Sequence, residues 1–358
     1  MAVSPPATIA RPAKRPAKAR VLATYVSTQL DAAECRRLAD IAGGIVLPGK
    51  TGASLAVQMR KHGYHGWLVL DPAVGKGAKP AVTADSLFGA DEWLEREQTA
   101  KADELLSPGE FIPVGEADTL KRVIAEQVVW TATSGGGRAV LYLDGRWLQN
   151  GAIQQVLDVL AVEANAGTSI AVAFGDTSDP LKLSGAVAGY VRLLTEAKDV
   201  AVLRCDLGAV GGLANGAAWS SVGTGTSNRH FQPPNKKTSS GAPGSCPSAL
   251  VRDLLTFKMG TSLAALPDKL IPVCHLPCCD GQKVSRFNDK AWAPQVRAHN
   301  VQTMAAIAAD LVAVSADRQA KEWKQVCAAA VDLRRRLAVD THDPGWDVVD
   351  QVTQWSVL

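Results

Sequence analysis

The sequence lacks several features that would place it in a common class. No apolar run approaches the length of a membrane span, and the N-terminus has no apolar core of a secretory signal. No G-x-G-x-x-G motif follows the first predicted strand, which disfavours a dinucleotide-binding fold. Cysteines are few, and several are clustered rather than spread as pairs, which is typical of a reducing compartment. We therefore expect a soluble cytoplasmic protein.

Acidic residues are absent from the first 20 residues, which hold two lysines and three arginines among alanines and prolines. Such a segment has too little apolar surface to fold, and it predicts a disordered basic arm that could follow nucleic-acid phosphates. A solubilising terminus is the alternative. The net charge of the whole chain is only +3, so no protein-wide attraction to nucleic acid is implied.

Acidic residues are also missing between Leu207 and Arg252. Within this stretch, residues 223–247 are rich in Gly, Ser, Thr, Pro and Asn, and they form too long a connection to be idle. The stretch carries four candidate nucleic-acid-binding residues: Arg229, His230, Lys236 and Lys237. Such a loop suits a polyanion. The alternative is a solvated loop with ordinary cations.

Short apolar runs alternate with amphipathic stretches from residue 21 onward. The predicted strands are 21–26, 44–47, 67–70, 111–114, 139–143, 169–174, 200–204 and 220–223. The predicted helices between them include 32–41, 55–61, 118–130, 152–164 and 183–196. Eight such units favour a (β/α)₈ TIM-type barrel over residues 21–358. Helices at 304–314 and 322–337 and a docked segment at 346–355 are expected to follow.

Four predicted strands end on an aspartate: Asp71, Asp144, Asp176 and Asp206. In a barrel these side chains would converge at the carboxyl ends of the strands, where active sites lie. Paired carboxylates can divide roles there, one ionised as a nucleophile or base and one held protonated. Capping of a turn or helix is the alternative for each of them.

Glycines follow Asp206 in the segment 208–216, which includes Gly211 and Gly212. Glycines in a loop let a ligand approach the backbone and leave amides free to bind it. By itself the pattern is weak, because Gly-Gly turns are frequent.

Three cysteines lie within six residues, and a histidine follows at the start of an apolar helical pattern: Cys274, Cys278, Cys279 and His299. Three thiolates and one imidazole form a closed tetrahedral zinc site, and closed sites are usually structural. We expect structural Zn²⁺ in a subdomain near residues 268–301. Buried free thiols in a turn are the alternative.

Together these segments resemble the tRNA-guanine transglycosylase superfamily, which includes DNA-acting relatives of 7-deazaguanine pathways. Residues 211–216 (Gly-Gly-Leu-Ala-Asn-Gly) resemble its Gly-Gly-Leu-Ala-Val-Gly loop, and residues 222–225 (Val-Gly-Thr-Gly) resemble its Val-Gly-Thr-Pro. The cysteine cluster with His299-Asn300 resembles its zinc module, Cys-x-Cys-x-x-Cys followed by His-Asn. The likeness covers residues 67–311.

The resemblance implies exchange of guanine for a 7-deazaguanine base in DNA or tRNA. Asp71 and Asp206 would be catalytic, and Asp144, Asp176, Gly211 and Gly212 would hold the base. Two departures stand out. The middle zinc cysteine would fall at Leu276, so Cys278 or His275 must replace it, and the family's late Asp-Cys-x-x-Pro-Thr-Arg nucleophile segment is absent. A non-catalytic zinc-containing barrel that binds nucleic acid beside a partner protein, or as a homodimer, is the alternative.

Overall fold

The computed structural model describes residues 21–26, 29–72, 87–163, 167–225, 228–234 and 246–358. The basic arm at 1–20, together with Lys236 and Lys237, lies outside the described residues.

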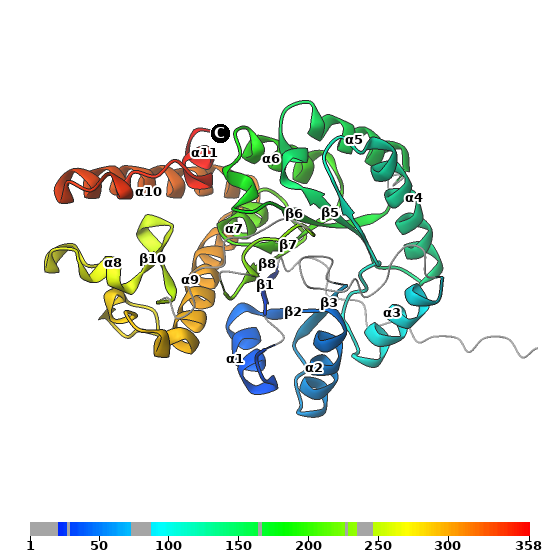
Figure 1. Cartoon of the computed structure of the whole chain (residues 1–358), viewed down its shortest axis with the longest axis horizontal. Coiled ribbons are helices and arrows are strands. Elements are labelled where there is room, and N and C mark those ends of the chain that lie inside the picture. The colour runs from blue at the N-terminus through cyan, green and yellow to red at the C-terminus, as the bar shows by residue number, and fades with distance from the viewer. Residues whose placement is uncertain (1–20, 27–28, 73–86, 164–166, 226–227, 235–245) are drawn as a thin grey trace, which may run out of the picture.

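Eight parallel strands form one curled sheet in the order β3-β2-β1-β8-β7-β6-β5-β4 (Figure 1). They are β1 (Val21–Tyr25), β2 (Gly44–Pro48), β3 (Trp67–Asp71), β4 (Phe111–Ile112), β5 (Arg138–Asp144), β6 (Ser169–Gly175), β7 (Val200–Cys205) and β8 (Trp219–Gly223). Isolated parallel bridges join Val69 to Glu104 and Leu106 to Arg138, so segment 104–106 lies between β3 and β5. The sheet is consistent with the predicted TIM-like barrel, and all eight predicted strands are present.

Helices alternate with these strands and surround the sheet (Figure 1). They are α1 (Ala32–Ala42), α2 (Gly49–Lys61), α3 (Leu87–Thr99), α4 (Ala117–Thr133), α5 (Ala152–Glu163), α6 (Ala186–Glu196) and α7 (Leu207–Ala214). Strands covered on both faces need apolar side chains on both faces, which explains the near-continuous apolar runs in the sequence. The prediction that residues 208–216 form a loop is wrong, because most of them belong to helix α7.

Two layers of buried side chains hold the barrel together. Inside it pack residues that include Tyr25, Val140, Tyr142, Trp219 and Phe231. Outside, the opposite faces of the strands pack against the helices in a larger cluster. Residues on alternating faces of each strand therefore supply both layers.

A small module follows the barrel in sequence. Its strands are β9 (Ser248–Val251), β10 (Thr256–Met259), β11 (Val273–Cys274) and β12 (Gln282–Lys283), with the short helix α8 (Gly260–Ala264). Its own apolar core includes Leu263, Phe287 and Trp346. Three helices complete the chain: α9 (Ala293–Ala313), α10 (Gln319–Thr341) and α11 (Gln351–Val357). Among the described residues, no helix combines the length and apolar character needed to cross a membrane.

Candidate functional site

The cysteine cluster and His299 come together in the module that follows the barrel. Cys274 ends β11, Cys278 and Cys279 lie in the turn before β12, and His299 projects from α9. Their ligand atoms all lie within 4.8 Å of one another. The His299 Nδ1 atom is 3.2 Å from the Cys279 Sγ and 3.6 Å from the Cys278 Sγ. Three sulfurs and one nitrogen at this spacing could hold a metal such as zinc.

Backbone contacts orient the histidine for this role. The His299 Nε2 atom lies 2.9 Å from the carbonyl oxygen of Leu250 in β9, so an Nε2–H can donate to it. In the neutral imidazole the lone pair is then on Nδ1, which faces the sulfurs. The next residue, Asn300, accepts a bond from the Leu250 N–H at 2.7 Å and donates to the Ser248 carbonyl at 3.0 Å. The His-Asn pair therefore fastens α9 to β9 and aims the imidazole.

The thiols and the imidazole of the cluster also shift one another's pKa values. The Cys278 thiol, and then the His299 imidazole, lower the pKa of Cys279 to about 4 against the opposing effect of burial. The bond to Cys279, followed by burial, raises the pKa of Cys278. Burial lowers the pKa of His299, but contacts with Cys274 and Cys279 outweigh it and raise the value to about 9. Cys279 is thus a thiolate paired with a protonated His299, and zinc binding there would release the imidazole proton.

Of the two replacements expected for the missing middle cysteine, the structure brings Cys278 into the cluster. The Cys278 N–H donates to the Gln302 side chain at 3.0 Å, and its carbonyl accepts from Arg286 at 3.1 Å. These bonds fix the turn. Cys278 therefore takes the place of the middle cysteine of the Cys-x-Cys-x-x-Cys pattern, although it lies four residues after Cys274 instead of two.

Asp71 ends β3 inside the barrel and is fully buried. Its Oδ2 atom accepts from the Tyr25 hydroxyl at 2.7 Å and from the Arg204 Nε at 3.2 Å. Its Oδ1 atom accepts from the Tyr142 hydroxyl. Burial raises the pKa of both tyrosines, so both hydroxyls keep their protons and donate. Asp71 is thus the fully buried counter-ion of Arg204, whose side chain is 13% exposed.

Phe231 covers this ion pair. Its ring is fully buried, 5.3 Å from the Tyr142 ring and 5.7 Å from the Arg204 guanidinium carbon. The Asp176 N–H donates to the Phe231 carbonyl at 3.3 Å, next to a bridge between Phe231 and Gly175. A Cβ atom on Gly175 would lie 2.5 Å from the Phe231 ring, so only glycine at position 175 allows the ring to lie there. Asp71 is therefore closed off from solvent.

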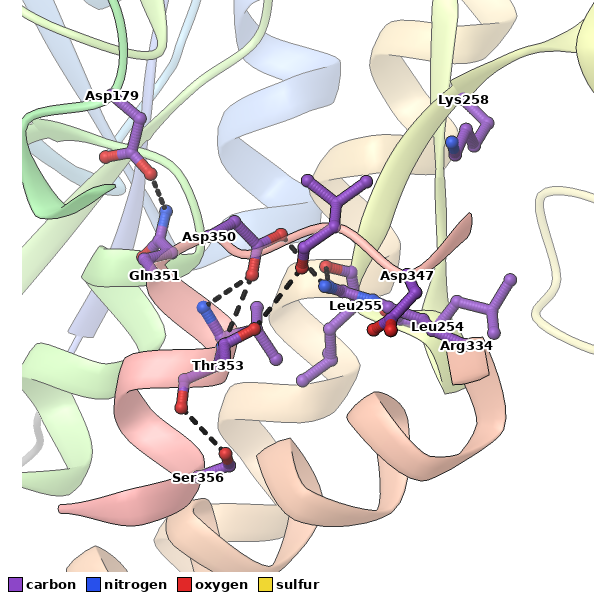
Figure 2. A network of polar contacts seen from close by, with 12 residues as sticks. Asp179, Leu254, Leu255, Lys258, Arg334, Asp347, Asp350, Gln351, Thr353 and Ser356 are labelled. Atoms are coloured by element: carbon purple, nitrogen blue, oxygen red, sulfur yellow. Dashed lines mark hydrogen bonds and ion pairs between the residues drawn. The ribbon is translucent and has the colours of Figure 1, made fainter. Parts of the chain in front are cut away.

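Asp206 lies in a different setting, directly after β7. It caps helix α7, and its Oδ2 atom is 3.6 Å from the His230 Nε2. Its Oδ1 atom accepts from the Gln351 side-chain amide at 2.5 Å. Figure 2 shows the second bond of this amide, which donates to Asp179 at 2.8 Å. Asp179, Asp206 and Gln351 line a cavity of about 190 Å³ that Lys182 and Phe257 also border. This volume is below the ~300–1,000 Å³ of drug-sized ligand sites.

The two carboxyl groups differ in their environments. Burial, and then the charge of Asp206, raise the pKa of Asp179 well above its usual range. Burial lowers the pKa of His230 despite the neighbouring Asp206, so this imidazole is neutral at pH 7. A carboxyl group that keeps its proton beside a second carboxylate is a typical acid/base arrangement.

Asp179, Asp206 and His230 form a second group that could hold a metal ion, because their ligand atoms lie within 4.8 Å of one another. The Gln351 amide donates to both carboxyl groups.

The other expected base-binding residues have local partners. Asp144 caps the turn at Gly145–Leu148 and forms a two-pronged ion pair with Arg146 at 2.9 Å, so the capping alternative holds for it. Asp176 accepts from the Thr177 N–H at 2.5 Å and from the Thr177 hydroxyl at 3.1 Å. Its charge acts on both Arg146 and His230. Asp144, Asp176 and Asp206 thus share one neighbourhood.

Gly211 and Gly212 lie within buried helix α7. A Cβ atom at Gly211 would be 2.6 Å from the Trp355 ring, and one at Gly212 would be 2.4 Å from the Tyr190 hydroxyl. These glycines allow close helix packing. The prediction that their backbone amides are free to bind a ligand is wrong, because the segment is helical.

Arg229 is buried rather than presented to solvent. Its guanidinium carbon lies 3.4 Å from the centre of the Phe257 ring, and its Nη2 atom donates to the Ser248 carbonyl at 3.2 Å. Burial lowers the pKa of Arg229 to about 10, so it stays charged at neutral pH. Arg229 and His230 fasten the segment before the module; Lys236 and Lys237 lie outside the described residues.

Several residues of these sites carry no sequence signal strong enough to single them out. Asp179, Gln351 and Arg204 belong to common patterns, and only folding brings them to Asp206 and Asp71. Asp179 stands before a proline in Ser-Asp-Pro, which indicates a cap and nothing more.

No protein-family model matches this chain, and no curated protein is significantly similar to it.

Proposed function

We propose that this chain is a zinc-anchored barrel that exchanges a nucleobase in the manner of the guanine transglycosylases. Its support is the grouping of Cys274, Cys278, Cys279 and His299 behind a TIM-like barrel, in the chain order that the resemblance implies. Zinc bound by these residues would cross-link β11, the following turn and α9 and take no part in the reaction.

The catalytic carboxylate in this proposal is Asp206. The observation that carries it is the pairing of Asp206 with Asp179, whose pKa is raised by burial and by the charge of Asp206. An Asp206 oxygen attacks C1′ of a guanosine nucleotide, the C1′–N9 bond breaks, and guanine leaves with the bonding pair and the proton of Asp179. The Asp179 carboxylate then removes a proton from the entering 7-deazaguanine, whose nitrogen attacks C1′ and frees Asp206.

Asp71 has a structural role in this proposal. Its carboxylate neutralises Arg204 and accepts from two tyrosines under Phe231, so it has no approach to a nucleotide. The reacting base must leave its stack to reach Asp206, as it does in other enzymes that act on bases.

Incorporation of radiolabelled guanine into duplex DNA and bulk tRNA tests this assignment. Asp206→Asn should reduce incorporation to background, because an amide is a poor nucleophile, while asparagine still caps α7. Asp179→Asn should slow exchange by about 10²–10⁴-fold as an acid/base residue is lost. Asp158→Asn is the matched control, since Asp158 is an exposed residue of α5 that accepts from Gln154 of the same helix. Wild-type exchange by Asp206→Asn would rule the assignment out.

A second candidate function is non-catalytic binding of nucleic acid beside a partner protein. The observation that favours it is the closed barrel centre, where Asp71 is paired with Arg204 beneath Phe231. This function predicts salt-sensitive retention of DNA or tRNA on a filter with no label incorporated at any pH. Incorporation by the wild type would exclude it.

A further inference from the structure

The C-terminal helix α11 reaches the carboxylate pair through one side chain. Gln351 is 3% exposed, and its Nε2 atom donates to Asp179 Oδ2 at 2.8 Å and to Asp206 Oδ1 at 2.5 Å. The orientation of the amide is fixed, because only the NH₂ group can face two acceptors. Asp206 directly follows β7, Asp179 caps the short helix Pro180–Lys182 after β6, and Gln351 lies 145 residues beyond Asp206.

A second network holds α11 in place (Figure 2). Asp350 caps the helix by accepting from the N–H groups of Val352 at 2.9 Å and Thr353 at 3.3 Å. Its other oxygen is 2.9 Å from the Arg334 Nη1. Buried Arg334 in α10 also donates to the carbonyls of Leu254 at 2.6 Å and Leu255 at 2.7 Å. The position of Gln351 is therefore tied to α10 and to the turn between β9 and β10.

Charged and titratable groups face the pair from several elements. His230 and Arg229 approach from the segment before the module, Asp350 from α11, and Lys182 borders the cavity. The Leu181 N–H also donates to Asp179 at 2.9 Å. Of the groups described around the pair, Gln351 is the one that hydrogen-bonds to both carboxyl groups.

We propose that Gln351 is a positioning residue that holds Asp179 and Asp206 at one spacing, and that α11 is thereby part of the reactive site. This inference rests on the proposed function for its catalytic meaning, but its geometry can be tested without activity. Hydrogen bonds from an amide stabilise the ionised form of a carboxyl group. Removing the Gln351 donor should therefore make Asp179 harder to ionise.

The test compares Gln351→Met with Gln354→Met. Gln354 lies in the same helix and donates to the carbonyls of Leu181 at 2.9 Å and Leu183 at 3.0 Å, without touching either carboxyl group. Both variants lose two bonds that tether α11, so a purely structural effect would appear in both. Carbon-13 NMR of labelled aspartates, assigned with Asp179→Asn and Asp206→Asn, gives the titrations directly.

In Gln351→Met we expect the titration of Asp179 to move to higher pH, because the bond from Gln351 lowers the pKa of this carboxyl group in the wild type. In Gln354→Met we expect the Asp179 titration to stay as in the wild type. An unchanged titration in Gln351→Met, or equal shifts in both variants, would overturn the inference. If Gln351→Met loses the fold of α11, Gln351→Glu provides the second test. It replaces a donor by an acceptor and must move Asp179 further in the same direction, so no shift there overturns the proposal too.

The two proposals fail in different ways. A wild type without exchange activity, combined with a shifted titration in Gln351→Met, would refute base exchange and keep the positioning role. Exchange with an unaltered titration would do the reverse.

Discussion

Burial decides the behaviour of individual charged residues in this protein. Asp71 and Arg204 form an ion pair within the barrel, and Glu97 is buried with one carboxylate oxygen, Oε1, accepting from the Leu106 N–H at 2.8 Å. Breaking a buried pair costs more than the pair contributes, because one charge is left without compensation. Because burial disfavours the ionised form of Glu97, this residue makes the stability of the protein depend on pH.

Asp71→Asn should lower the free energy of unfolding by about 3–5 kcal/mol, since Arg204 then remains charged inside the barrel without its counter-ion. Urea unfolding gives this value. Asp40→Asn is the control, because Asp40 forms an exposed pair with Arg36, and it should change stability by less than about 0.5 kcal/mol. A loss as small as that of the control would mean that Asp71 is free to react.

Glu97→Gln should alter the pH dependence of stability. Burial raises the pKa of Glu97 well above its usual range, against the bonds from Leu106 and Trp93. The folded protein holds this proton at pH values where the unfolded chain has released it, so stability falls as pH rises above the unfolded pKa. Glutamine keeps an acceptor and removes the titration. Between pH 5 and pH 8 the free energy of unfolding of the variant should rise relative to that of the wild type, by at most about 1.4 kcal/mol per pH unit.

Urea unfolding at several pH values measures this gain. Glu92→Gln is the matched control on the same helix, because Arg96 lowers the pKa of that exposed carboxyl. If the difference in the free energy of unfolding between Glu97→Gln and the wild type stays constant with pH, the Glu97 carboxyl group ionises normally in the wild type.

At the scale of elements, the close approach of α7 to its neighbours defines the wall of the barrel near Asp206. Helix α7 is buried along its length, and its glycines face Trp355 of α11 and Tyr190 of α6. Tyr190 donates to the Gly208 carbonyl at 3.0 Å, which leaves no room for a larger side chain. The glycine run therefore serves packing between helices.

Gly212→Ala should destabilise the protein by about 1–3 kcal/mol, although alanine normally favours a helix, because the added methyl group overlaps the Tyr190 hydroxyl. Thermal or urea unfolding measures the loss. Gly225→Ala is the control, since nothing lies within 4 Å of a Cβ atom there. Equal stability of the two variants would indicate that α7 can move away from Tyr190 and that Gly212 is available for a ligand.

At the scale of the whole molecule, the metal cluster and the C-terminal helices attach the module to the barrel. His299 and Asn300 of α9 bond to β9, and α10 reaches the turn between β9 and β10 through Arg334. The module core is separate from the core clusters of the barrel. A metal at Cys274, Cys278, Cys279 and His299 would therefore stabilise this module most directly.

Cys279→Ser should abolish stoichiometric zinc binding, because it removes the sulfur that ionises most readily. Hydrogen exchange should then accelerate in β9, β10 and the start of α9, and stay unchanged in β5 and β6. Cys246→Ser is the control, since that thiol donates to the Phe287 carbonyl, which a hydroxyl can also do. Metal analysis and exchange mass spectrometry give both results; zinc retained by Cys279→Ser would contradict the proposed ligand set.

The sequence by itself determined the repeating architecture and the local chemistry of short segments. Each barrel strand is an apolar run of a few residues, so periodicity alone located all eight, and Cys274, Cys278 and Cys279 are close in the chain, so spacing alone grouped them. Tertiary structure decided everything that depends on distant partners. It turned the glycine run into a packed helix against Trp355, gave Asp71 to Arg204, and brought Asp179 and Gln351 to Asp206. The physical reason is that burial and pairing set the state of a carboxyl group, and both arise from residues tens to hundreds of positions away.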